Sequence, residues 1–343
     1  MIAIDPPDEH AREQAREWSD RQAKPTGSLG RLEELASWVA ACQGVCPPRS
    51  LDRVRAVVLA GDHGVSRHGV SAYPREVTAA MLSAFVEGHA GVAVLARQHG
   101  VALTVHDLGV DAELPPELAA VVGRFKINRG SRPIHRDDGL TELETQQSID
   151  AGEAIAAAEV AAGCDLMIIG DMGIGNTTPA AALVAAGLGL PAEQVTGRGT
   201  GIDAATRVHK TELIDTALTR VGDRVTDPFQ RLAALGSADL AAGVGCLIGA
   251  ARAGVPVLLD GLISVAEATV AQDLAPGTIA WCRAGHRSTE PAQQLALARL
   301  GLEPLVDLGM RLGEGSGALT ALPVLRSAVL LLRELALLSE LGG

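Results

Sequence analysis

The sequence predicts an α/β protein in which a parallel sheet is wrapped by helices. Two observations lead to this expectation. From residue 51 onward, short apolar runs of strand length alternate with longer helical patterns, which is the order typical of parallel sheets. The chain is also long, at 343 residues, and 47% of it is hydrophobic, which allows a large core and excludes a disordered chain.

The N-terminal segment is predicted to be helical. Residues 8–24 are charged and follow a helical pattern, and a loop at residues 25–30 separates them from a second helix over residues 31–41. Pro47 and Pro48 end this segment, because proline and the residue before it disfavour helix.

The predicted sheet follows, with helices between its strands. A long helix is expected over residues 77–98, with Gly88 and Gly91 as its weak points. The apolar runs expected to form strands are residues 53–60, 101–108, 165–169, 255–259 and 279–282. Ligands of such sheets bind beyond the carboxyl ends of the strands. The unusual loops expected at that edge are residues 61–74, 170–178, 260–264, 285–290 and 310–317.

The loop after the third strand has the features of a phosphate site. It holds three glycines and leads into a helix for which we expect Thr178 as N-cap and Pro179 as the first helical residue. Backbone N–H groups and the helix dipole at such a junction favour an anion, and Asn176 and Thr177 add polar side chains. A tight turn of any parallel α/β protein would look similar, and the glycine spacing G-x-x-G-x-G differs from the dinucleotide-binding G-x-G-x-x-G.

A single carboxylate stands out in the loop at residues 310–317. Glu314 lies among three glycines there, with Arg311 nearby. One explanation is that the segment caps the next helix, for which Ser316 would be the better cap. The other is that Glu314 is a general base whose pKa is set by burial and by its neighbours.

The loop after the first strand carries two histidines and the only tyrosine of the chain. His63 and His68 have no carboxylate pair nearby in the sequence, so we expect a structural role and no metal site. Tyr73, together with Met81 in the helix that follows, fits equally well in the core and in the wall of a pocket for an aromatic ligand.

Charge and cysteine content limit the partners and the compartment. The net charge of −12 argues against nucleic-acid and anionic-membrane partners. Five scattered cysteines fit free thiols in the cytoplasm, and residues 1–6 lack the features of a signal peptide. The apolar run at residues 321–341 carries charged residues, so it is expected to be a core or amphipathic helix. The basic residues considered for holding an anion, each of which also fits a solvated surface position, are Lys24, Lys210, Arg287 and Arg311.

Taken together, these segments resemble the nicotinate-nucleotide–dimethylbenzimidazole phosphoribosyltransferase family, whose enzymes make α-ribazole phosphate for the lower ligand of cobalamin. The resemblance covers nearly the whole chain. It rests on motifs in the same order, namely KPTGSLGRLE at 24–33, SAYPREVT at 71–78, GIGNTTPA at 173–180, PVLLDG at 256–261, LGMRLGE at 308–314 and GEGSGA at 313–318. It implies a Rossmann-like large domain of residues 51–317, a small helical domain of residues 1–50 and 318–343, and a homodimer.

The resemblance also implies a reaction and a site. The phosphoribosyl group would pass from nicotinate mononucleotide to 5,6-dimethylbenzimidazole or a related base, with inversion at C1′ and without a cofactor. Nicotinate leaves with a neutral ring nitrogen, so no general acid is needed. The attacking base must lose a proton, and one carboxylate is enough to accept it. The resemblance implies that Glu314 accepts that proton and that Asp171 orients the incoming base. The residues that it places at the phosphate site are Gly175, Asn176, Thr177, Thr178, Lys210, Ser288, Arg311, Leu312 and Gly313.

Two positions depart from the pattern of some family members. Asp171 stands where some members have Glu, and its side chain is one methylene shorter. Tyr73 and Met81 stand where some members have Ser and Gln, which makes the predicted base pocket more apolar.

Two other functions compete with this one. An NAD-dependent dehydrogenase on a similar sheet would need the G-x-G-x-x-G turn and an acidic residue about 20 residues further on. Glu193 is near that distance but lies in an expected loop. The second alternative, a non-catalytic nucleotide-binding sensor, would give Glu314 no function.

Overall fold

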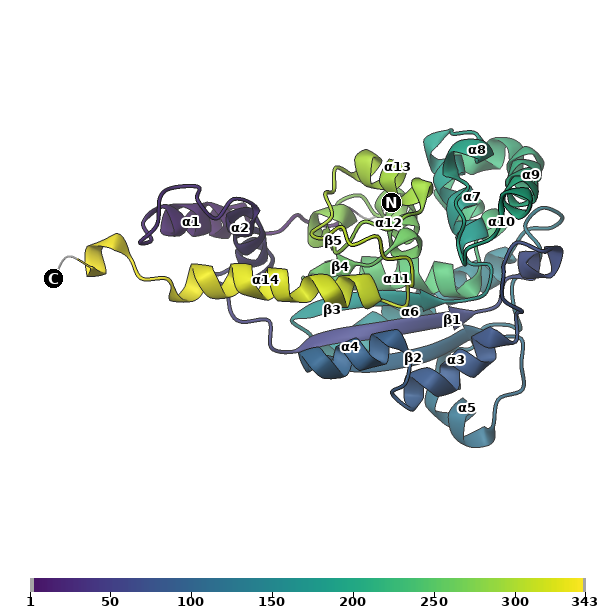
Figure 1. Ribbon diagram of the computed structural model, residues 1–343, viewed down its shortest axis with the longest axis horizontal. Coiled ribbons are helices and arrows are strands. Elements are labelled where there is room, and N and C mark those ends of the chain that lie inside the picture. The colour runs from purple at the N-terminus through teal and green to yellow at the C-terminus, as the bar shows by residue number, and fades with distance from the viewer. Residues whose placement is uncertain (1–2, 342–343) are drawn as a thin grey trace.

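The computed structural model describes residues 3–341 and shows an α/β fold built on a five-stranded parallel sheet (Figure 1). The strand order is β2-β1-β3-β4-β5. The strands are β1 (Val54–Gly61), β2 (Ala102–Gly109), β3 (Leu166–Met172), β4 (Val257–Leu259) and β5 (Cys282–Ala284). The α/β prediction is confirmed. Residues 1–2 and 342–343, the outermost ends of the predicted small domain, lie outside the described residues.

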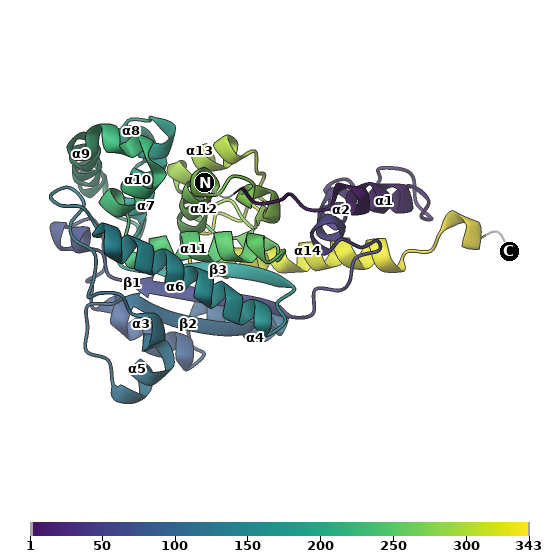
Figure 2. The same cartoon turned by 180° about the vertical axis from the view of Figure 1, so that it is seen from behind.

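Helices cover both faces of the sheet, which is why the strands are nearly continuous apolar runs. Helices α6 and α11 cover one face, and α3, α4 and the first turns of α14 cover the other (Figures 1 and 2). The helices are α1 (Glu9–Asp20), α2 (Arg31–Gln43), α3 (Val77–Val86), α4 (Gly91–His99), α5 (Pro116–Val122), α6 (Glu142–Ala161), α7 (Thr177–Leu188), α8 (Ala192–Val195), α9 (Ala204–Val221), α10 (Pro228–Leu235), α11 (Ala238–Arg252), α12 (Leu262–Leu274), α13 (Pro291–Leu300) and α14 (Ser316–Glu334).

Three predicted boundaries are wrong. The expected helix over residues 77–98 is two helices, because the chain turns at residues 87–90, where Gly88 has a φ of +82°. Helix α7 begins at Thr177 with Asn176 at its N-cap, so Thr178 and Pro179 are already helical. Residues 278–281 form a 3₁₀ helix, and the fifth strand begins after them.

The N-terminal helices α1 and α2 and the outer part of the C-terminal helix α14 lie side by side at one end of the molecule (Figure 1), whereas the backbone N–H of Ile4 donates to the Pro276 carbonyl in the main body. Helix α14 begins against β3 and β4 and runs outward to α1 and α2 (Figure 1). It is one continuous helix, so a domain boundary at residue 318 falls inside it. The division into residues 1–50 with 318–343 and residues 51–317 stays a prediction.

Two apolar stretches have the length and hydropathy of a membrane span, Val77–His99 and Ser316–Glu334. The turn at residues 87–90 interrupts the first, and the second packs on the sheet and on α2. Core helices of globular folds meet the same two criteria, so the length and hydropathy of these stretches do not indicate a membrane span.

Candidate active site

A cavity of about 390 Å³ opens at the carboxyl edge of the sheet. It lies where the strand order reverses between β1 and β3, the usual position of a ligand site in this architecture. All five predicted loops contribute to its wall. The contributing residues include Tyr73, Asp171, Asn176, Thr177, Asp260, Ser288, Arg311, Leu312, Gly313 and Glu314.

Glu314 lies in the cavity wall in an unusual backbone conformation. Its φ is +67°, and no other non-glycine residue in the described chain has a positive φ. Such conformations are strained and concentrate at functional sites. The side chain is only 5% exposed, and Oε2 accepts a hydrogen bond from the Val92 backbone N–H at the start of α4 (3.3 Å). Burial, helped by the nearby Asp260 carboxylate, raises the pKa of Glu314 to about 7, and the hydrogen bond from the Val92 N–H opposes this shift.

Asp260, at the end of β4, holds the backbone on which Glu314 sits. Its Oδ1 accepts hydrogen bonds from the N–H groups of Gly317 (2.7 Å) and Ala318 (3.0 Å), and its Oδ2 accepts one from Gly315 (3.2 Å). Asp260 therefore caps α14, and the explanation that Glu314 does so is wrong. The sequence analysis missed this residue, although a carboxylate directly after a buried strand was a signal for it.

The Glu314 loop passes close over β3. A Cβ at Gly170 would collide with the Glu314 carbonyl oxygen, so glycine is required for this approach. The next residue, Asp171, lines the cavity and accepts a hydrogen bond from Asn176 Nδ2 (2.6 Å). Burial raises the pKa of Asp171 well above its usual value, and the neighbouring Asp239 and Glu267 carboxylates add to this effect.

The opposite end of the cavity is cationic. Lys210 is completely buried behind the wall and donates a hydrogen bond to Thr177 Oγ1 (2.7 Å) at the start of α7. Burial lowers the pKa of Lys210 to about 8, while Glu290 opposes the shift. Arg311 reaches over the same end and donates to the Gly199 carbonyl (3.2 Å). This end combines a helix N-terminus with two positive side chains, which suits a phosphate.

The loop around Gly199 is a part of the site that the sequence analysis missed. Gly199 and Thr200 line the cavity, and the Gly199 N–H donates to Glu290 Oε1 (2.8 Å). Glu290 in turn donates its backbone N–H to Ser288 Oγ (3.1 Å), which fixes a predicted phosphate residue. The glycine-rich run at residues 197–201 was the available signal.

Several predicted residues lie outside the cavity wall. Gly175 faces Ser66 and Val70, and Thr178 is fully buried, so both support the loop from behind. Lys24 pairs with Glu33 (2.9 Å), and Arg287 pairs with Asp307 (3.2 Å). These last two basic residues are not part of the anion site.

Tyr73 and Met81 both line the cavity, with Val77 between them on the same wall. The Tyr73 side chain is 57% exposed, which places it at the mouth and not in the core. Leu312 is similarly exposed and also lines the cavity. This geometry favours a pocket for a flat apolar ligand over a packing role.

Comparison with known proteins agrees with the geometry. A phosphoribosyltransferase family model matches residues 4–342. The chain is 52% identical to the nicotinate-nucleotide–dimethylbenzimidazole phosphoribosyltransferase of Mycobacterium marinum over 339 residues, which is 99% of this chain and 94% of that protein. It is 50% identical to the protein of the same name from Mycobacterium avium, covering 100% of this chain and 97% of that one. Its structure matches the crystal structure of CobT from Thermus thermophilus with a TM-score of 0.92 and 40% identity, over 97% of this chain and 98% of that chain. The chain therefore belongs to the nicotinate-nucleotide–dimethylbenzimidazole phosphoribosyltransferase family and is an enzyme.

Proposed function

We propose that this enzyme transfers the phosphoribosyl group of nicotinate mononucleotide to 5,6-dimethylbenzimidazole or a related base, giving α-ribazole 5′-phosphate and nicotinate. One observation carries the proposal. Glu314, a buried carboxylate with a pKa near neutrality, shares a cavity with the N-terminus of α7, where Lys210 and Arg311 supply positive charge. The names of the relatives point to the same reaction, and the family assignment leaves no reason to retain the dehydrogenase or the sensor.

The proposed chemistry needs a base but no acid. The pyridinium nitrogen of nicotinate mononucleotide takes the electrons of the broken C1′–N bond and leaves neutral. A ring nitrogen of the incoming base attacks C1′ from the opposite face, which inverts the configuration. The other ring nitrogen then becomes acidic, and ionised Glu314 accepts its proton. Holding both reactants in line lowers the barrier by removing much of the entropic cost of their encounter.

The polar groups divide between the two substrates. The phosphate would lie at the N-terminus of α7, on Asn176 and Thr177, with Lys210 and Arg311 supplying positive charge. The base would lie between Glu314 and the apolar wall that holds Tyr73. Asp171, on the cavity floor, would orient the base.

The proposal predicts a pH dependence of kcat. Because Glu314 works only when ionised, kcat should fall about tenfold per unit below a pH of about 7. The groups that shift the pKa of Glu314 are the Val92 N–H and Asp260, and His286 Nε2 lies 3.7 Å from Asp260 Oδ1. Asp260→Asn removes a negative charge that raises the pKa of Glu314, so the acid limb should move to lower pH. The check is kcat measured from pH 5 to 9 in the unmodified enzyme and in Asp260→Asn. If the acid limb of the profile lies at the same pH in both proteins, Glu314 is not the base.

The pocket wall predicts the choice of base. Tyr73 and Met81 offer aromatic and thioether surface, so bases with fewer hydrogen-bonding groups, including simpler benzimidazoles, should be accepted. Replacing them together by Ser and Gln should shift the discrimination between bases by about 1–3 kcal/mol. The check is kcat/KM for a series of bases, with Leu143→Ser, an exposed substitution outside this cavity, as the control. If the bases keep the same order of kcat/KM in the double variant, Tyr73 and Met81 do not contact the base.

We also propose that the enzyme is a homodimer in the cytoplasm. Val86 on α3 and Val121 on α5 are 46% and 61% exposed beside the edge strand β2. Apolar side chains beside an unpaired sheet edge favour burial against a second copy. All five cysteines are free thiols, which fits a reducing compartment. Light scattering on the purified protein should give twice the monomer mass.

A further inference from the structure

Four titratable side chains meet in the interior beneath the floor of the active-site cavity. His63 follows β1, Asp171 lies in β3, Asp239 is in the first turn of α11, and Glu267 is in α12. All four are buried, and Asp171 also lines the cavity. The reaction proposed above uses only Asp171, so the other three need another explanation.

These side chains lack the hydrogen bonds that buried polar groups normally make. In the described chain, both ring nitrogens of His63, both carboxylate oxygens of Asp239 and of Glu267, and one oxygen of Asp171 have no hydrogen-bond partner. His63 Nε2 lies 3.1 Å from Asp239 Oδ2, which is an ion-pair distance if the imidazole is protonated. Nearly all buried polar atoms in proteins are partnered. The cluster therefore points to a partner that it holds in common.

The spacing of the cluster is that of ligands around one ion. One donor atom each from His63, Asp171 and Asp239 lie within 4.8 Å of one another. Adjacent ligands bound to Zn²⁺ at about 2.0–2.2 Å in tetrahedral geometry are about 3.3–3.6 Å apart. The distance between His63 Nε2 and Asp239 Oδ2 is 3.1 Å, so these two atoms would need to separate by a few tenths of an ångström to hold such an ion.

Glycines on three elements make room for the cluster. A Cβ at Gly61 would come within 2.8 Å of the Asp239 carboxylate, and one at Gly173 within 2.5 Å of His63 Nε2. A Cβ at Gly243 on α11 would collide with the Glu267 carboxylate. The side chains of the cluster therefore pack directly against the backbone at these three glycines, where any larger residue would displace them.

Charge balance favours a dication. No lysine or arginine in the described chain pairs with Asp171, Asp239 or Glu267. An ion of charge +2 would neutralise the carboxylates of Asp171 and Asp239.

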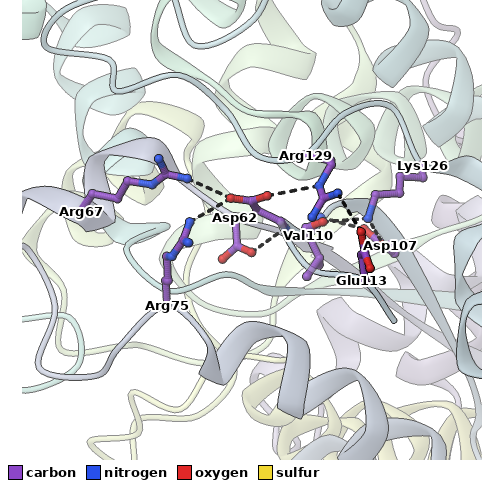
Figure 3. A network of polar contacts seen from close by, with 9 residues as sticks. Asp62, Arg67, Arg75, Asp107, Val110, Glu113, Lys126 and Arg129 are labelled. Atoms are coloured by element: carbon purple, nitrogen blue, oxygen red, sulfur yellow. Dashed lines mark hydrogen bonds and ion pairs between the residues drawn. The ribbon is translucent and has the colours of Figure 1, made fainter. Parts of the chain in front are cut away.

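The segment that carries His63 is fixed on its outer side. Asp62 accepts a hydrogen bond from the Asp111 N–H (2.8 Å), and the Asp111 carboxylate binds Arg67 and Arg75 (2.8 Å each). Arg129 adds a third contact to Asp111 (3.3 Å), as part of the network in Figure 3. These contacts hold the histidine in place independently of any ligand.

We propose that His63, Asp171 and Asp239 bind one divalent transition-metal ion, Zn²⁺ or Mn²⁺, beneath the cavity floor. An imidazole with carboxylates suits these ions, whereas Mg²⁺ and Ca²⁺ prefer oxygen ligands alone. The ion would hold Asp171 ionised and fixed at the floor. The expectation of no metal site rested on the sequence around His63, but both carboxylates come from distant parts of the chain.

The test counts ions and needs no substrate, so its outcome is independent of the proposed reaction. The full-length protein is stripped with EDTA, dialysed and titrated with MnCl₂ while free Mn²⁺ is followed by EPR. Zn²⁺ retained after desalting is counted by mass spectrometry. We expect one ion per chain, and pulsed EPR of bound Mn²⁺ should show coupling to one imidazole ¹⁴N. This last measurement identifies the histidine ligand even if a variant fails to fold.

Variants then locate the ion. Asp239→Asn and His63→Asn should weaken binding by at least about tenfold. The matched controls His68→Asn and Asp137→Asn, outside the cluster, should bind as the unmodified protein does. Absence of stoichiometric binding, absence of the ¹⁴N coupling, or equal affinity in folded Asp239→Asn would overturn the proposal and leave a cluster filled by water and shared protons.

Discussion

Replacement of Glu314 by Gln is expected to lower kcat by about 10²–10⁴ while the fold and the binding of both substrates are retained. The substitution removes the only group that the mechanism uses as a base. It keeps the side-chain length, and the amide oxygen still accepts from the Val92 N–H. The backbone strain at φ +67° is the same for both residues, so the melting temperature should change little. Steady-state kinetics with both substrates, together with thermal unfolding, measure the two expectations.

The control for this variant is Glu334→Gln, on the exposed end of α14. It should have the kcat of the unmodified enzyme. If Glu314→Gln also keeps that kcat, Glu314 is not the base, and the cavity would need another group to take the proton.

Replacement of Lys210 by Met is expected to raise the KM for nicotinate mononucleotide by about 10–100-fold, the effect of losing a charge-assisted hydrogen bond. The KM for the base should change little. Lys210 acts at the phosphate end, through Thr177 and α7, and Met preserves its volume in a fully buried position. Initial rates with each substrate varied in turn separate the two KM values.

Lys24→Met is the matched control, because Lys24 is also largely buried and pairs with an acid, Glu33, far from the cavity. It should leave both KM values unchanged. An equal rise in the two KM values for Lys210→Met would mean that the substitution disturbs the whole site, and the phosphate assignment would be withdrawn.

The sequence located the sheet and the site edge because both depend on local patterns. Apolar runs such as Leu166–Ile169 predict buried strands, and parallel strands bring their following loops together. That is why the loops that carry Tyr73, Asn176 and Glu314 share one cavity. The helix over residues 77–98 was mispredicted because Gly88 adopts a conformation that ends the helix, whereas glycines inside other helices, such as Gly243 in α11, do not.

What the sequence missed depends on contacts between distant residues. Asp260 caps a helix more than fifty residues later in the chain, and no local pattern links it to Glu314. Asp239 meets His63 only because α11 packs across β1 and β3. The residue pattern alone did not separate Lys210 from Arg287; the family resemblance singled out Lys210, and the fold adds that Lys210 is fully buried whereas Arg287 pairs at the surface.

The most direct test of the proposed reaction is to incubate the enzyme with nicotinate mononucleotide and 5,6-dimethylbenzimidazole and to follow both products. The account predicts that nicotinate and a ribosylated base form in equal amounts, and that the anomeric proton in the NMR spectrum shows the α configuration. Nicotinate release that does not require the base, a β-configured product, or no product at all would contradict it.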